Sequence, residues 1–153
     1  MKYEPGVIEA RGYKAGKVAL TEKHETTGPA MAIKVTADRT EINADGEDVA
    51  ILKVEVLDKE GRTVPTANNS IGFKISGEGV LMGVGNGDPN CQESDKEPRR
   101  SLFNGLAQVI LQSTKTPGEI HIQAAVEGWD GNELTPTKLI IKTKSVELRP
   151  TVA

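Results

Sequence analysis

The polar residues best suited to chemistry gather in one loop, between the strand-like segments 71–84 and 107–113. A compact domain rarely keeps so long an irregular segment without a use for it. The loop holds four carboxylates, two adjacent arginines and the single cysteine of the chain, which are Asp88, Glu93, Asp95, Glu97, Arg99, Arg100 and Cys91. Two carboxylates at a fixed separation are the groups that hydrolyse a glycosidic bond. Carboxylates on an exposed loop are normally just hydrated, so we interpret this loop as a polar surface rather than a catalytic site.

The sequence does not match the residue spacing of motifs that bind metals or nucleotides. Counted from Asn43, an EF-hand loop needs Gly at the sixth position and Glu at the twelfth, where this chain has Asp and Val. The glycine-rich run 83–87 continues into Asp88 rather than into the Gly-Lys-Ser/Thr of a P-loop. His24 and His121 lie too far apart in sequence to indicate a zinc site. The sequence therefore predicts no metal, no cofactor and no catalytic set.

Aromatic side chains are the usual platforms for sugar rings on β-sandwiches. The chain has only one tryptophan, two tyrosines and two phenylalanines. Phe73 and Phe103 are expected in the core or anchoring the loop, and Tyr3 and Tyr13 belong to an N-terminal hairpin. Trp129, in Glu-Gly-Trp-Asp-Gly, is the remaining candidate for a platform. A tryptophan partly covered by its own turn is the simpler interpretation.

Composition excludes several partner classes. The 153 residues are 37% hydrophobic and 27% charged, with a net charge of −3 and interspersed signs. Such a chain offers no basic field for nucleic acid. It also has no apolar run long enough to span a bilayer, so we expect neither nucleic acid nor membrane as a partner. One cysteine cannot form an internal disulfide or a multi-thiolate metal site.

Two units are expected from the pattern of strands and turns. Residues 1–28 predict a terminal β-hairpin followed by a linker, with a Lys-Ala-Gly-Lys turn at residues 14–17. A lone hairpin is marginal in water, so it must pack on the rest of the chain, on another copy or on a neighbouring domain. Self-association through residues 1–28 is therefore one expectation.

Residues 29–153 predict an all-β domain. Apolar residues alternate with polar ones in seven segments, and no window shows the 3.6-residue period of a helix. We therefore expect an immunoglobulin-like antiparallel β-sandwich of about seven strands. The Cys…Trp…Cys pattern of antibody domains is absent. The segments are 33–37, 50–57, 71–75, 80–84, 107–111, 120–126 and 139–141.

Three runs of sequence resemble a known family. The run AIKVTADRTEINADGEDVAILKVEVLDKEGRTVPTANNSIGFKISGEG, followed by GVGNGDP and RRSLFNGLAQVILQS, resembles the C-terminal Ig-like domain of family 2 glycoside hydrolases. These are the β-galactosidase-like enzymes of gut Bacteroidetes and related bacteria. The opening YEPGVIEARGYKAGKVALTEKHETTG is similar to the last hairpin of the small β-sandwich domain that precedes it there.

The resemblance implies a non-catalytic accessory domain. In such enzymes the catalytic acid and nucleophile lie in a TIM barrel, so this chain is expected to hydrolyse no glycoside itself. Its expected partners are the catalytic and neighbouring domains of the same polypeptide, through packing or oligomer contacts, and carbohydrate is a further candidate. The parent is expected to be periplasmic or secreted. The expected contact residues in the 86–104 loop are Asn86, Asp88, Arg99, Arg100 and Asn104.

Three alternatives stay open on the sequence. The polar groups of the loop can instead stabilise the loop itself, with Asp88 capping a turn and the arginine stems covering apolar surface. A carbohydrate-binding module would use the 86–104 loop together with Trp129. A bacterial adhesin repeat is the other alternative, although no internal repeat is visible.

Overall fold

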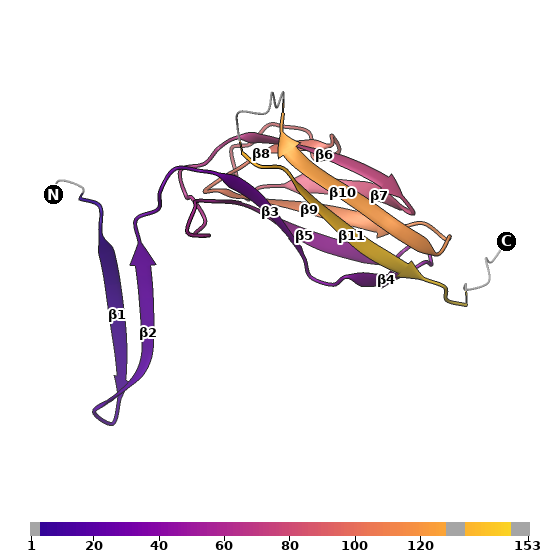
Figure 1. The fold of residues 1–153 in the computed structure, drawn as a ribbon. Helices are drawn as coiled ribbons and strands as arrows, with labels where there is room; N and C mark the ends of the chain where they lie inside the picture. Colours follow the sequence, from indigo (N-terminus) through magenta and orange to yellow (C-terminus); the bar gives the residue numbers. More distant parts are fainter. Residues whose placement is uncertain (1–3, 128–133, 148–153) are drawn as a thin grey trace.

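The computed structural model describes residues 4–127 and 134–147, and every regular element within them is a β-strand. Two sheets stack face to face as a sandwich, and a two-stranded hairpin extends away from one end of it (Figure 1). The strands in chain order are β1 (Val7–Lys14), β2 (Lys17–Glu25), β3 (Ala32–Ala37), β4 (Glu41–Asn43), β5 (Val49–Leu57), β6 (Ser70–Gly77), β7 (Gly79–Gly85), β8 (Arg99–Ser101), β9 (Leu106–Ser113), β10 (Gly118–Val126) and β11 (Thr137–Lys144).

The sandwich consists of a five-stranded and a four-stranded sheet. The first has the order β4–β11–β10–β6–β8 and the second the order β3–β5–β9–β7. Neighbouring strands pair antiparallel except β4 and β11, which run parallel. The predicted all-β sandwich is confirmed.

The core follows directly from the alternation in the sequence. Successive side chains of a strand point to opposite faces, so every second residue of β5, β9 and β10 enters the space between the sheets. In β5 these are Ala50, Leu52, Val54 and Val56, all completely buried. Ile71 of β6 and Ile141 of β11 meet them from the five-stranded sheet and are equally buried. The sandwich thus forms one continuous apolar core.

The described sandwich has nine strands rather than about seven. The two additional strands, β4 and β8, are three residues long. Such strands are too short to show alternation, because pairing with β11 and β6 defines them. They form the two edges of the five-stranded sheet. Their absence from the prediction therefore reflects a long-range property that no local pattern carries.

The strands of the hairpin β1–β2 pack hardly at all against the sandwich. Every residue of its two strands is exposed except Glu25, which is half-buried. Across the hairpin Ile8 pairs with His24, and Gly12 pairs with Leu20, so Ile8 and Leu20 share a face. Ile8 is 76% exposed and Leu20 is 66% exposed. Within the described residues, the sandwich therefore does not cover the apolar side chains of the hairpin.

Candidate functional site

The loop after β7 joins the edges of the two sheets on one side of the sandwich. Strand β7 is the edge of the four-stranded sheet and β8 is the edge of the five-stranded one. The Val84 N–H donates to the Asp95 carbonyl at 2.9 Å, and Lys96 Nζ donates to the Met82 carbonyl at 2.6 Å. The Phe73 N–H donates to the Pro98 carbonyl at 2.8 Å. Because an unpaired strand edge recruits other strands, this covering protects the edge of β7.

Arg100 lies at the centre of this loop, inside the protein. Its side chain is 2% exposed. The guanidinium donates to Cys91 Sγ at 2.9 Å, to the Val84 carbonyl at 3.0 Å and to the Asp95 carboxylate. Burial by itself lowers the pKa of Arg100, but the contacts with Cys91 and Asp95 outweigh it and raise the pKa. Arg100 thus connects strand β7 with two points of the loop.

Two other predicted contact residues also serve the loop itself. Asn86 Nδ2 donates to the Ser101 carbonyl at 2.9 Å, and Asn86 Oδ1 accepts from the Asp88 N–H at 3.0 Å. Asp88 Oδ1 accepts from the Asn90 N–H at 2.9 Å. These are short-range turn contacts of the kind that Asn and Asp side chains make readily.

A third carboxylate closes the same loop onto β8. Glu93 accepts hydrogen bonds from the backbone N–H and the hydroxyl of Ser101. These bonds lower the pKa of Glu93, with the nearby charge of Arg100 contributing and burial opposing. The side-chain groups of the loop are therefore largely engaged with one another.

Asn104 has a conformational role. Asn104 and Gly105 have φ values of 52° and 75°, and they form the two-residue turn between Phe103 and Leu106. Positive φ at both central residues is the property of a type I′ turn, for which Asn-Gly is the preferred pair. A Cβ at position 105 would lie 2.3 Å from the Val64 carbonyl oxygen. The polar side chain of Asn104 is exposed.

The predicted contact residues do not converge on one point. Asn86, Asp88 and Arg100 lie within the loop fold, and Asn104 lies in a separate turn. Arg99 is exposed and pairs with Glu97 at 2.8 Å. The hydrogen bond to Glu97 is the largest cause of the raised pKa of Arg99. Trp129 lies outside the described residues, so its role as a sugar platform stays a prediction, as does contact of the loop with another domain.

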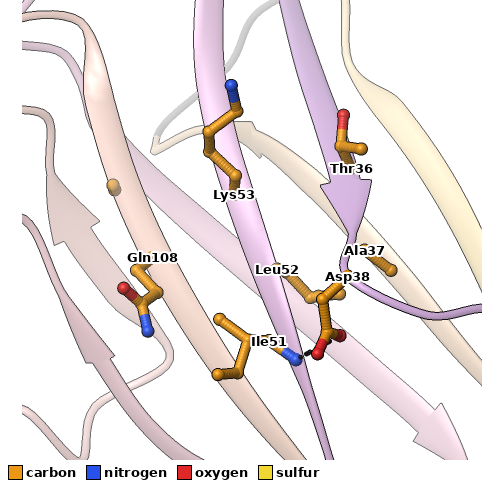
Figure 2. A pocket seen from close by; sticks show the side chains of 8 residues that line it. Thr36, Ala37, Asp38, Ile51, Leu52, Lys53 and Gln108 are labelled. Carbon is orange, nitrogen blue, oxygen red and sulfur yellow. Dashed lines mark hydrogen bonds between the residues drawn. The ribbon is translucent and has the colours of Figure 1, made fainter.

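A shallow hollow of about 350 Å³ lies between β3, β5 and β9 (Figure 2). Ile51, Lys53 and Gln108 line it from neighbouring strands, and Asp38 closes one end (Figure 2). Asp38 Oδ1 accepts from the Ile51 N–H at 2.9 Å. Asp38 is the only carboxylate of the lining, whereas hydrolysis of a glycosidic bond requires two. The hollow therefore lacks the groups of a glycosidase site.

A buried ion-pair cluster joins the hairpin to the sandwich. The side chain of Asp58 is fully buried and accepts from the Gly28 N–H at 2.9 Å and from Arg62 Nε at 2.8 Å. Arg62 also donates to Glu25, the last residue of β2, at 3.1 Å and to Glu60 at 3.0 Å. We call these five residues, Glu25, Gly28, Asp58, Glu60 and Arg62, the clamp.

The clamp is electrostatically well matched. Burial alone raises the pKa of Asp58, but hydrogen bonds from Arg62 and from the Gly28 N–H hold the pKa far below its ordinary range. Hydrogen bonds from Lys23 and then from Arg62 lower the pKa of Glu25. The bond to Asp58 raises the pKa of Arg62. Glu25, Asp58 and Arg62 are therefore charged at neutral pH.

Sequence reasoning missed the clamp because its members are far apart in the chain. Gly28 and Asp58 are separated by 30 positions, and Glu25 and Arg62 by 37. The available signal was local: an Asp followed four residues later by an Arg, around a turn that contains Gly61. Asp58 accepts from the backbone N–H groups of Glu60 and Arg62 within that turn.

Within residues 4–127 and 134–147, no group of three or more His, Cys, Asp or Glu side chains is placed to hold a metal ion. No helix long and apolar enough to cross a membrane is present in that part of the chain.

Comparison with known proteins gives the family. The family model described as "Glycoside hydrolase family 2 C-terminal domain 5" matches residues 33–135, which is most of the sandwich. The chain belongs to this family. The resemblance seen in the sequence is thereby confirmed.

Relatives of this glycoside hydrolase family 2 domain are much longer proteins. Beta-galactosidase BoGH2A of Bacteroides ovatus is 36% identical over 128 residues, which cover 84% of this chain and 15% of that protein. A beta-glucuronidase of Formosa agariphila is 33% identical over 142 residues, covering 91% of this chain and 14% of that protein. The chain thus spans about one seventh of these relatives.

A solved structure agrees with this family 2 domain in three dimensions. A glycosyl hydrolase family 2 member from Bacteroides cellulosilyticus superposes with a TM-score of 0.86 at 30% identity, covering 94% of this chain and 18% of that one. The match includes most of the hairpin as well as the sandwich, because it covers nearly the whole chain. The chain is therefore an accessory domain of family 2 enzymes and not their catalytic domain.

Proposed function

We propose that this chain is a structural accessory region of a β-galactosidase- or β-glucuronidase-like glycosidase, and that it holds neighbouring domains of that enzyme in place. The observation that carries this proposal is the hairpin. Its two strands expose five large apolar side chains, while a charged cluster fixes its base to the sandwich. A hairpin that is fixed at its base and exposes its apolar side chains is suited to pack against a neighbouring domain. The exposed side chains are Val7, Ile8, Tyr13, Val18 and Leu20.

The division into domains follows from the same observation. Residues 1–28 belong, on this proposal, to the sheet of a preceding β-sandwich domain, and residues 29–153 form the accessory domain. A two-stranded hairpin is marginally stable alone, and adding it to a larger sheet would pair its open edges and cover one face. The family model matches residues 33–135 and begins after this boundary, which supports the division.

The clamp gives the accessory domain a specific task. Arg62 and Asp58 belong to the sandwich and hold Glu25 and Gly28 at the base of the hairpin. A neighbouring domain that incorporates the hairpin would therefore inherit its orientation from the clamp. The contribution to catalysis is indirect, through the placement of domains.

Hydrogen exchange tests the proposal. In the 153-residue chain we expect the amides of β1 and β2 that face outward from the hairpin to exchange without protection. In a full-length glycosidase that carries this region, the same amides should be protected at least 100-fold, because they pair with a neighbouring sheet. Equal exchange in both proteins would refute the proposal. The core amides of β5 and β9 serve as the internal reference.

A further inference from the structure

The outer face of the five-stranded sheet carries a groove with a lysine on each side. Strands β6, β10 and β11 form its floor, and its volume is about 330 Å³. Directly paired residues place Lys74 of β6 and Lys138 of β11 on either side of Gln123 of β10. The next row consists of Ser76, His121 and Ile140.

The two lysines are free to bind an anion. Among the residues described, neither the Lys74 nor the Lys138 ammonium takes part in an ion pair or hydrogen bond. Glu119 and Glu127 are the acidic residues of β10 and its end, and each is four residues from Gln123. That separation is about 13 Å between Cα atoms along a strand, although the Glu119 carboxylate reaches back to within 3.4 Å of His121 Nε2 in the neighbouring row. The row itself holds two ammonium groups and no carboxylate, in a protein whose net charge is −3.

The spacing of the row suits a carboxylate held between two ammonium groups. Neighbouring strands lie about 4.8 Å apart, so the two lysine Cα atoms are separated by roughly 10 Å across β10. Lysine side chains are long and flexible enough to converge on one anion from that separation, each contributing strongly charged donors. Between them the Gln123 amide offers both a donor and an acceptor.

The remaining lining residues suit a polyhydroxylated ring. Ser76 and His121 are exposed, and the Ser76 hydroxyl can exchange hydrogen bonds with sugar hydroxyl groups. His121 Nε2 lies 3.4 Å from Glu119 Oε2, so this pair offers a ring nitrogen and a carboxylate side by side. Ile140 is 48% exposed and offers an apolar surface to ring C–H groups. The groove volume of about 330 Å³ lies at the small end of the range for ligand sites.

We propose that the Lys74–Gln123–Lys138 groove binds an acidic saccharide, through a carboxylate held between the two lysines. This site is separate from the hairpin, and it adjoins the 86–104 loop, since Lys74 and Gln123 also line a second hollow together with Pro98. It does not rest on the proposed structural role, so its failure would leave that role untouched.

An NMR titration of the labelled 153-residue chain tests this inference. The probes are tri-galacturonic acid, its fully methyl-esterified form as the neutral match, and a glutamate tripeptide as a non-saccharide acid. We expect tri-galacturonic acid to cause saturable shifts at Lys74, Ser76, Gln123 and Lys138, at millimolar concentration and weakening with added salt. The ester and the tripeptide should each bind at least 10-fold more weakly.

Matched double substitutions locate the site. Lys74→Gln/Lys138→Gln should weaken tri-galacturonic acid binding at least 10-fold. Lys34→Gln/Lys115→Gln removes the same charge from exposed positions elsewhere and should change the affinity less than 2-fold. Circular dichroism establishes that both variants are folded.

Several results would overturn the inference. Equal binding of the methyl ester would show that charge is not recognised, and shifts confined to the 86–104 loop would place any sugar site there instead. Equal binding of the glutamate tripeptide would indicate an acidic protein surface as the partner. An equal loss of affinity in both double variants would indicate a general charge effect without a site.

Discussion

Arg100 shows how one buried cation can organise a long surface loop. Its guanidinium contacts strand β7 through the Val84 carbonyl and the loop through Cys91 and Asp95. A buried arginine is rare unless it is paired, so a loop that folds over it is held in one arrangement. The same contacts leave this side chain unavailable to an outside ligand.

Removing that side chain should cost far more than removing its neighbour. For Arg100→Ala we expect the free energy of unfolding to fall by about 2–4 kcal/mol, because a cavity forms and the Val84 carbonyl and Asp95 lose a donor. For Arg99→Ala, whose side chain is exposed, we expect a loss of at most about 0.5 kcal/mol. Urea unfolding of both variants gives the comparison. Similar losses in the two would contradict the role assigned to Arg100.

The turn at Asn104 and Gly105 allows a second test at single residues. Asn104→Gly should leave stability nearly unchanged, because glycine adopts a positive φ without strain. Gly105→Ala should destabilise by about 2 kcal/mol or more, since its positive φ and the approach of the Val64 carbonyl both oppose a Cβ. Thermal unfolding measures both changes. If Asn104→Gly instead proved strongly destabilising, the asparagine side chain would have a role beyond conformation.

At the scale of elements, two sets of side-chain contacts connect parts of the fold that strand pairing does not join. The loop between β7 and β8 joins the edges of two sheets, and the clamp joins the hairpin to the sandwich. Both depend on buried charges with several hydrogen bonds. The Arg100 contacts lie within an irregular loop, and the clamp joins residues 30 and 37 positions apart, so the alternation of strands could reveal neither.

The clamp should make stability depend on acidity in a defined direction. The pKa of Asp58 is depressed in the folded state, so its stabilisation is fully present above the unfolded pKa of about 3.9. It is lost as the pH falls below that value. We therefore expect Asp58→Asn to be less stable than the wild type at pH 7, and the difference to shrink steadily from pH 4 towards pH 2. Urea midpoints across that range measure it.

A matched variant compares the buried carboxylate of the clamp with the exposed one. Glu60→Gln changes an exposed partner of Arg62, and we expect it to destabilise the protein at pH 7 by less than Asp58→Asn does. A difference between Asp58→Asn and wild type that stays constant from pH 7 to pH 2 would contradict the assignment.

At the scale of the whole molecule, the sandwich should fold without the hairpin. No side chain of β1 or β2 is buried against the core, and the contacts between the parts lie in the clamp. We expect a chain of residues 29–153 to unfold within about 3 °C of the full chain, since a small ΔΔG shifts the melting temperature by only a few degrees. Calorimetry measures the two midpoints.

The same pair of chains tests self-association. If the exposed hairpin recruits a second copy, the full chain should form dimers by light scattering while residues 29–153 stay monomeric. A dimer in both would place the contact on the sandwich, and monomers in both would exclude the hairpin as a self-association site at the concentration used.

The sequence predicted the sandwich well because its strands are half-buried. Ala50, Leu52, Val54 and Val56 alternate with exposed or charged residues, and the structure buries all four. The interior position of Arg100 could not be predicted, since arginine is normally exposed and only tertiary contacts identify a buried one. The Asn104–Gly105 turn was predictable in principle, because Asn-Gly between apolar residues is a strong hairpin signal. From the sequence we instead interpreted Asn104 as a residue that contacts another domain or a sugar.

The clamp holds the hairpin only at its base, so a small rotation there becomes a large displacement at the tip. Nine residues of β2 span about 30 Å, so a rotation of roughly 10° at its base moves its tip by about 5 Å. A thermal fluctuation at the clamp, or a change of geometry caused by a substitution at Asp58 or Arg62, would thus displace the tip of the hairpin by a larger distance. In the domain arrangement proposed above, the stiffness of these few hydrogen bonds would set how precisely neighbouring domains are placed.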